Sequence, residues 1–291
     1  MSDAASLSRR WFVAGVGVSI LGAGCSDGAP ARVPASDEIL ALEHSMHEAV
    51  NRDRAAAGMP PLAYDERLAD IARAHALDMH QHLFFAHESP TTGTLDDRLS
   101  RASYLAAVAR ENLAEAPDVP LAEDGLMKSP HHHENLMATD VTHIGIGIVT
   151  GGVKDPRNLV FVQVFGRPVE RQTPEEAKAT VIERIAKARA AKGLGAATID
   201  STLDKLAASH LSDLPDAVPD GALENIGKAV LKEANRQGSI LVTGARVISA
   251  TEYDPPSAVL GPKVSIGVAA GAAKDDKGHD AMKILVIVAG S

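Results

Sequence analysis

Cysteine and aromatic residues are scarce in this sequence, and each scarcity narrows what the protein can be. Cys25 is the only cysteine among 291 residues, so the chain cannot form an intramolecular disulfide and must be stabilised by packing. Aromatic residues make up only 3% of the chain, and Tyr253 is the only one that follows Phe165. Proteins that bind bases or sugars usually stack them on aromatic faces, so this composition argues against such ligands.

Positive charge is also in deficit. The formal net charge is −9 at pH 7, and a chain of this sign repels phosphate backbones. We therefore expect no nucleic-acid partner. At 291 residues the chain is long enough for two domains, each with its own core.

Residues 1–25 are typical of an export signal. The stretch "SRRWF" resembles a twin-arginine signal, and the uncharged run from Trp11 to Gly24 is too short to span a bilayer comfortably. The run ends at Cys25 behind small residues, which resembles a lipobox and predicts lipidation of that cysteine. An ordinary cleaved signal with a site at Ala29–Ala31 is the alternative. Either way we expect an exported protein, periplasmic or anchored to the membrane of a bacterial cell envelope as a lipoprotein, with residues 26–36 as a flexible tether.

The remaining sequence contains an internal repeat. Residues 54–78 align with residues 189–213 at an offset of 135 without a gap, and nine positions are identical. Three further pairs of blocks follow in the same order: "ENLA" at Glu111 with "ENIG" at Glu224, "HIGIGIV" at His143 with "SIGVAAG" at Ser265, and "FVQVFG" at Phe161 with "LVIVAG" at Leu285. This order predicts two homologous domains, residues 37–168 and 172–291, of which the second is degenerate.

Apolar spacing and capping residues predict an α+β fold. Helices are expected over residues 36–58, 65–82, 94–102, 120–129 and 130–138. Residues 143–150 and 158–166 are apolar strands separated by a glycine-containing turn, which predicts an antiparallel hairpin. His75 and its repeat mate His210 lie on apolar helical stripes, so both are expected to pack between the helix and the core.

The blocks "FFAHESPTTGTLDDRLS", "ARENLAEA", "LMKSPHHHENLMATDVTHIGIGIV" and "LVFVQVFG" resemble the signature blocks of the CAP superfamily, in its bacterial SCP-like branch. This is the family of cysteine-rich secretory proteins, antigen 5 and pathogenesis-related proteins. The resemblance covers residues 37–168 and implies an α-β-α sandwich with a central groove. The second copy resembles the family only weakly.

The resemblance also implies a groove cluster of two histidines and acidic residues. His87 and Glu111 match the first histidine and the first glutamate, and His132 matches the second histidine because Ser129-Pro130 fixes the register. The second glutamate of eukaryotic members falls at Ser129, so that carboxylate is missing, and Glu123 or Asp124 is left open as its substitute.

Two imidazoles and a carboxylate can hold Zn²⁺, or they can form a hydrogen-bonded cluster without a metal. Both interpretations stay open for His87, His132 and Glu111, with zinc as the candidate cofactor and no residue assigned a catalytic role. A metalloprotease H-E-x-x-H helix is excluded because no histidine follows His133-Glu134 at the required spacing. Consecutive helical residues point about 100° apart, so the neighbours His131 and His133 are expected to face solvent.

These observations predict an exported cell-envelope protein that binds a lipid, peptide or protein partner in a groove lined by His and Glu. A metal could assist that binding. The alternative is a metal-dependent hydrolase of the envelope, and the sequence leaves open whether the protein is an enzyme. The second domain is expected to serve in packing, in pairing with the first, or in partner binding.

Overall fold

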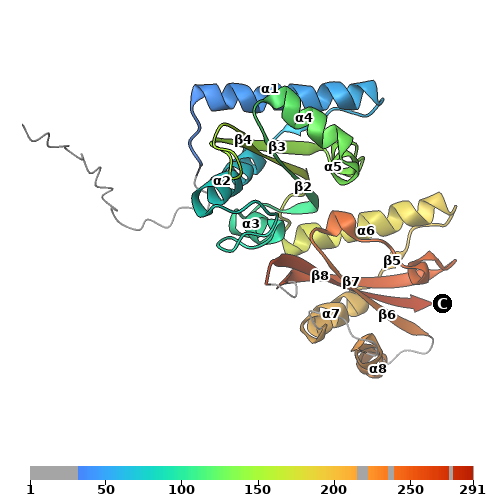
Figure 1. The fold of residues 1–291 in the computed structure, drawn as a ribbon. Coiled ribbons are helices and arrows are strands. Elements are labelled where there is room, and N and C mark those ends of the chain that lie inside the picture. The colour runs from blue at the N-terminus through green and yellow to red at the C-terminus, as the bar shows by residue number, and fades with distance from the viewer. Residues whose placement is uncertain (1–31, 215–221, 235–238, 275–277, 291) are drawn as a thin grey trace, which may run out of the picture.

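The computed structural model describes residues 32–214, 222–234, 239–274 and 278–290 (Figure 1). The predicted signal segment, Cys25 and most of the tether lie outside the described residues. Within those residues, none of the helices combines the length and the apolar character that crossing a membrane requires.

The helices and strands alternate along the chain in two similar series. The first half (residues 32–168) contains α1 (Asp37–Ala56), β1 (Ala63–Tyr64), α2 (Glu66–His82), α3 (Leu95–Arg101), β2 (Ala106–Ala116), α4 (Val119–Lys128), α5 (Pro130–Leu136), β3 (His143–Thr150) and β4 (Leu159–Pro168). The second half (residues 172–290) contains α6 (Pro174–Ala191), β5 (Thr198–Ile199), α7 (Ser201–His210), η1 (Leu211–Asp213), α8 (Ala222–Ala234), β6 (Ile240–Val247), η2 (Ala250–Glu252), η3 (Ser257–Leu260), β7 (Val264–Lys274) and β8 (Asp280–Gly290).

The helices of the first half begin where the sequence predicts. The side chains of Ser36, Asp65, Thr94 and Asp118 each accept a hydrogen bond from a backbone N–H of the first helical turn. Such caps satisfy donors that the helix itself leaves unpaired. The predicted hairpin is confirmed, since β3 and β4 pair antiparallel from His143–Gly166 to Thr150–Leu159.

The first sheet has the strand order β1-β3-β4-β2 and is covered by helices on both faces. Helices α1, α4 and α5 pack on one face, where Ile144, Ile146 and Phe161 form the core. Helices α2 and α3 pack on the other face against Val160, Val162 and other small apolar side chains. The predicted α+β fold with an α-β-α layer order is therefore observed in the first half (Figure 1).

The second sheet repeats this arrangement with the order β5-β7-β8-β6. Helix α6 packs on one face, which Figure 1 shows turned towards the first half, and α7 and α8 pack on the other. The short helices η2 and η3 lie between β6 and β7, where the first half has α4 and α5. The duplication of an ancestral domain stays a prediction, but the shared strand order is consistent with it.

A buried arginine makes matching hydrogen bonds in both halves. Arg54 donates to the backbone carbonyls of Pro60, Leu136 and Ala138, and Arg189 donates to those of Gly195, Val259 and Gly261. Both side chains are almost completely inaccessible to solvent. Each arginine therefore satisfies carbonyls that the loops leave unpaired, at positions the repeat aligns.

The alignment of "ENLA" with "ENIG" is wrong. Glu111 lies on β2, whereas Glu224 lies on helix α8, where its exposed side chain pairs with Lys228. The strand that corresponds to β2 is β6. The two four-residue stretches look alike, and only the first of them pairs with a strand, β4.

The last aligned block is shifted by one residue. His143 of β3 pairs with Gly166, and Ser265 of β7 pairs with Ala289, so Phe161 corresponds to Ile284 rather than to Leu285. Burial agrees, because Ile284 packs towards α6 and Leu285 packs towards α7. A slip of one residue moves a strand's side chains to the opposite face. With the corrected register, Val242 of β6 corresponds to Glu111, and Val286 corresponds to Gln163.

The two aligned histidines differ in their surroundings. His75 is fully buried, as predicted, and its Nε2 donates to the Ala86 carbonyl at 3.1 Å. His210 is not a core residue: its side chain is 12% exposed, with Nδ1 2.8 Å from Asp213 and Nε2 3.3 Å from Glu233. These carboxylates raise the pKa of His210, because the hydrogen bond to Asp213 favours the charged imidazole.

The pH dependence of stability should reveal this pair of contacts. Since the folded pKa of His210 is raised, its stabilising contribution is complete below the unfolded value of about 6.5 and is lost as pH rises through the folded value. Unfolding free energies of the wild type and of His210→Asn, measured by urea titration from pH 5.5 to 9, should therefore converge as pH rises. A difference that stays constant over this range would contradict the assignment.

Candidate functional site

A buried ion pair forms the base of the predicted groove cluster. Glu111 of β2 has a side chain only 4% exposed, and its Oε2 accepts a hydrogen bond from Arg98 Nη2 at 2.5 Å. Arg98 projects from α3 and is equally buried. Its other terminal nitrogen donates to the carbonyls of His87 and Gly93, so one guanidinium ties the strand, the helix and the intervening loop together.

His87 lies above this ion pair. Its Nδ1 donates to the remaining oxygen of Glu111, Oε1, at 2.9 Å, while its side chain is 59% exposed. The carboxylate fixes the ring and the tautomer, which leaves Nε2 available at the surface. His75 also approaches the same oxygen, with its Nε2 at 3.9 Å, and burial lowers the pKa of His75.

A buried carboxylate also holds the loop that carries His87. Asp78, near the end of α2, accepts hydrogen bonds from the hydroxyls of Ser89 and Thr91, and an imidazole nitrogen of His82 lies 2.7 Å away. A bridge between Ser89 and Gly93 closes the turn. These contacts explain "ESPTTG" as turn chemistry that orients His87.

His132 lies on α5, on the other side of β2. It is half-buried, whereas its neighbours His131 and His133 are exposed, as the sequence predicts. Burial and the nearby His87 lower the pKa of His132. Ser129 joins α4 to α5 and makes no capping hydrogen bond through its side chain.

Two side-chain amides fix α5 against β2. Asn112 is fully buried and donates to the His132 carbonyl at 3.2 Å and to the Gln163 side chain at 3.1 Å. Asn135 donates to Asn112 Oδ1 at 2.9 Å and to the Glu111 carbonyl at 3.2 Å. The positions of Glu111 and His132 are therefore coupled through hydrogen bonds rather than through a direct contact.

The same network continues to Glu123. Its Oε2 accepts from Gln163 at 3.3 Å, and its Oε1 is buried without a partner within the described residues. Glu123 is 4% exposed, whereas Asp124 is exposed and pairs with Lys128. Of the two candidates for the missing acidic residue, only Glu123 is connected to His132, through hydrogen bonds of Gln163 and Asn112. Glu123 itself lies in the core.

The sequence did not single out Arg98, Asn112, Asn135 or Gln163. Arg98 is part of the quoted "DDRLS" block, and Asn112 and Asn135 lie in "ENLA" and "HHHEN", but no spacing rule joins them. A polar glutamine inside the apolar run "LVFVQVFG" was the one local signal that could have indicated a buried polar network.

Burial raises the pKa of Glu123 to about 7, and the nearby Asp53 raises it further while Gln163 and Arg52 oppose the shift. Between pH 4.5 and 7 the folded protein therefore holds a proton that the unfolded chain has lost, so stability falls as pH rises. Glu123→Gln should remove this dependence and raise the unfolding free energy at pH 8 by up to about 3 kcal/mol. Urea titrations at pH 5 and pH 8 measure the effect.

The matched control is Asp124→Asn, the exposed neighbour on the same helix. This variant should keep the wild-type change between pH 5 and pH 8. If Glu123→Gln retains the full change as well, Glu123 is not the group responsible.

Of the two interpretations that the sequence leaves open, the zinc site does not fit this arrangement. Both oxygens of Glu111 are occupied, by Arg98 and by His87, and a guanidinium repels a cation. Within the described ranges, no group of three or more His, Cys, Asp or Glu side chains is arranged to hold a metal ion. His87 and His132 alone offer fewer protein ligands than zinc sites use.

The first half thus combines a helix-covered sheet with a cluster of His and Glu side chains at its edge strand β2. Residues 47–165 match the family described as "CAP: Cysteine-rich secretory protein family". The first half of this chain is a CAP domain, and we use that name for it below.

Two relatives come from Bacillus subtilis (strain 168). The uncharacterized protein YkwD is 34% identical over 119 residues, 40% of this chain and 46% of that protein. The uncharacterized membrane protein YlbC is 33% identical over 107 residues, 36% of this chain and 31% of that protein. The chain thus spans less than half the length of either curated relative.

Solved structures with a similar domain are also bacterial. An extracellular protein containing a SCP domain from Bacillus anthracis str. Ames aligns with a TM-score of 0.41 and 30% identity, over 46% of this chain and 45% of that chain. An outer surface protein from Borrelia burgdorferi aligns with a TM-score of 0.41 and 20% identity, over 47% of this chain and 97% of that chain.

Proposed function

We propose that this chain is an exported cell-envelope protein whose CAP domain binds a lipid, peptide or protein partner in the groove formed by His87, Glu111 and His132. The contact that carries the proposal is the buried Arg98–Glu111 pair, which holds the exposed His87 ring in place. Because the carboxylate is fully engaged, it orients His87 rather than accepting a substrate proton. The cluster therefore presents fixed polar groups to a ligand.

His132 adds an uncharged ring to the proposed groove. The pKa of His132 is lowered by burial and by His87, so its imidazole is uncharged at neutral pH and can donate or accept a hydrogen bond. A metal-dependent hydrolase is the weaker candidate, because the donor set offers too few free ligands for zinc.

The second half lacks the polar side chains that form the cluster in the CAP domain. Valines occupy the positions that correspond to Glu111 and Gln163, and no histidine lies between η2 and β7. We propose that it is a degenerate copy of the CAP domain that serves in packing or in partner binding.

Binding in the groove can be tested by histidine NMR of the mature protein. We would add, separately, vesicles of phosphatidylethanolamine and phosphatidylglycerol, a peptide digest of envelope proteins, and zinc chloride. The lipid or the peptide sample should shift the His87 and His132 ring signals, and His87→Ala or His132→Ala should weaken binding about tenfold or more.

His133→Ala is the matched control, because His133 is the exposed neighbour of His132. It should bind as the wild type does. If neither sample shifts the two rings, or if His133→Ala weakens binding as much as His132→Ala, the proposed groove is wrong. Micromolar zinc binding lost in both alanine variants would instead favour the hydrolase.

Export and lipidation concern residues outside the described part of the chain. We propose acylation of Cys25, which mass spectrometry of the native N-terminus would detect as a lipid-modified cysteine. A mature chain that begins at Arg32 without a lipid would refute the anchor but not the groove.

A further inference from the structure

We propose that the outer edge of β2 binds an extended segment of another polypeptide, which adds to the first sheet as a strand and passes through the cleft between the two halves. This inference rests on the proposed function and names its ligand class. It also gives the second half a role.

The strand β2 offers an open edge for such pairing. It is the last strand of its sheet, and among the described residues no strand pairs with its outer side. Asn135 reaches the Glu111 carbonyl from this side. In an antiparallel strand every second residue points both its N–H and its C=O to the same side, so Ala109 and Leu113 share this outward direction. Apart from the Glu111 carbonyl, which Asn135 binds, these backbone groups have no partner strand among the described residues, and such a row is a template for another extended chain.

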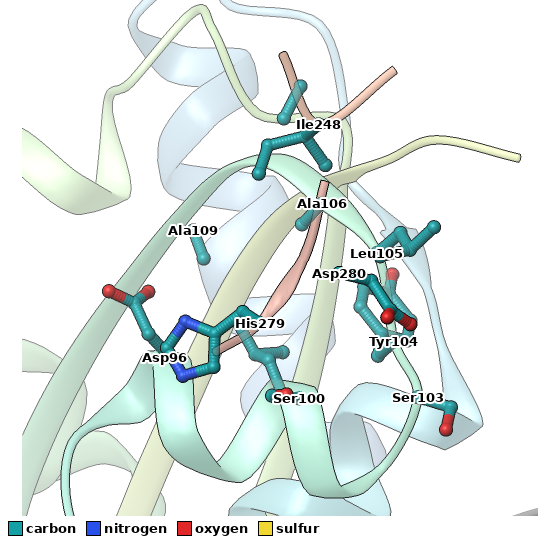
Figure 2. A pocket seen from close by; sticks show the side chains of 12 residues that line it. Asp96, Ser100, Ser103, Tyr104, Leu105, Ala106, Ala109, Ile248, His279 and Asp280 are labelled. Carbon is teal, nitrogen blue, oxygen red and sulfur yellow. The ribbon is translucent and has the colours of Figure 1, made fainter. Parts of the chain in front are cut away.

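A cleft of about 230 Å³ lies along the first part of this edge. Figure 2 shows Asp96 and Ser100 of α3 and Ala106 and Ala109 of β2 with Ile248, His279 and Asp280 of the second half around it. The β2 residues that line the cleft are the alanines 106, 107 and 109, whose side chains are too small to cover the backbone.

The cleft and the histidine cluster lie close together along β2. Ala109 precedes Glu111 by two residues, about 7 Å along a strand. Helix α3 contributes to both sites, since Asp96 and Ser100 line the cleft and Arg98 binds Glu111. An extended segment of about five residues is therefore long enough to occupy the cleft and contact His87.

Polar contacts hold the second half at this position. His279 Nε2 lies 3.3 Å from Asp97 Oδ1, next to Arg98 in sequence, and Arg167 makes two hydrogen bonds with Glu252. The wall opposite β2 is thus fixed to the CAP domain at two places. The cleft therefore lies between the open edge of β2 and the second half.

The chemistry of the cleft selects a peptide among the three candidate partners. Its lining includes Asp96, Ser100, His279 and Asp280, and burying these groups against an aliphatic tail would cost their hydration. A peptide backbone instead supplies the donors and acceptors that the edge needs. The acidic chain excludes a nucleic acid.

A peptide selection on the full mature protein tests this inference. We would select from a phage-displayed random decapeptide library and measure the selected peptides by calorimetry. Ala109→Pro removes an outward N–H without removing a bond to β4, and Ala109→Ser keeps it. The proline variant should bind at least about tenfold more weakly, and the serine variant within about twofold of the wild type.

N-methylation of the peptide gives a second measurement that leaves the protein unchanged. In an extended peptide, alternate N–H groups point towards β2 and away from it. Methylation of the amides that point towards β2 should abolish binding, and methylation of the others should not. A library that yields no binder, or binding that is insensitive to both the proline and the methyl groups, would overturn the inference. Dimerisation lost in Ala109→Pro without peptide would identify a second copy as the occupant instead.

The outcomes also separate this inference from the proposed function. If the groove ligand still depends on His132 while Ala109→Pro has no effect, the groove stands and only the strand pairing fails. If His132→Ala and Ala109→Pro both leave binding unchanged, both proposals fail.

Discussion

Replacing Arg73 with methionine should destabilise the CAP domain by about 3–5 kcal/mol. Arg73 of α2 makes three contacts with Glu43 of α1, including one of 2.6 Å between Nη2 and Oε2, and a fourth with Asp70. The Glu43 side chain is 1% exposed and that of Arg73 is 7% exposed, so removing the arginine leaves a carboxylate buried without its counter-charge.

Two neighbours would not replace the arginine. The hydroxyl of Tyr64 lies 3.3 Å from Glu43, and the N–H of Ile148 also lies 3.3 Å away. Burial already raises the pKa of Glu43 despite Arg73, and losing the arginine should raise it further. The destabilisation should therefore be largest at pH 8 and smaller near pH 5, where the carboxyl can bind a proton.

Urea unfolding at both pH values measures this effect. Lys128→Met is the matched control, because it breaks an exposed ion pair with Asp124 and should cost no more than about 0.5 kcal/mol. The double variant Glu43→Leu/Arg73→Met should recover much of the loss, since an apolar pair does not need a counter-charge. A loss below about 1 kcal/mol in Arg73→Met would show that the pair does not stabilise the fold.

Gly145→Ala should cost about 3 kcal/mol or more, at the upper end of what overpacking a core costs. A Cβ at Gly145 would lie 2.1 Å from the backbone nitrogen of Ala69 and 2.2 Å from the carbonyl carbon of Leu68. Those atoms belong to α2, which packs directly on β3, and a helix backbone cannot turn aside as a side chain can. The helix would have to move away from the sheet.

Thermal and urea unfolding of Gly145→Ala measure this cost. Gly125→Ala is its control, since a Cβ there meets no atom within 4 Å and alanine favours the helix by about 1 kcal/mol. The same contact occurs in the second half, where a Cβ at Gly267 would lie 2.1 Å from Leu203, so Gly267→Ala should be similarly destabilising. An unchanged stability in Gly145→Ala would show that α2 can shift at little cost.

The helices of the first half were predictable because their signals are local. Ser36, Asp65 and Thr94 each precede an apolar pattern and cap a helix within a few residues of the expected start. Capping joins a side chain to a backbone N–H two or three residues further along the chain, so sequence order places both partners. The hairpin of β3 and β4 was predictable for the same reason.

Strand register and strand identity were not predictable to the same degree. The stretch "ENIG" forms a helix although "ENLA" forms a strand, and the last repeat block was aligned one residue out of register. Both errors concern pairing between strands distant in sequence. Apolar runs such as "LVIVAG" are buried on both faces and therefore carry no alternation that fixes the register.

The histidine cluster was likewise predictable in its local features but not in its long-range contacts. Sequence motifs predicted that His87, Glu111 and His132 share a groove, and they distinguished the half-buried His132 from its exposed neighbours. The buried Arg98 was not foreseen, because α3 and β2 bring it onto Glu111 through tertiary packing. That contact occupies the carboxylate and argues against zinc binding at this cluster.

By itself, the sequence determined the helix boundaries of the first half and the family resemblance, and it supplied the candidate groove residues, since each depends on residue type or on short-range spacing. Only the tertiary structure decided which polar side chains share a buried network, which glycines let α2 approach the sheet, and where the second half meets β2. Those features join residues tens of positions apart, and the free energy of burying them is set by packing that no local pattern encodes.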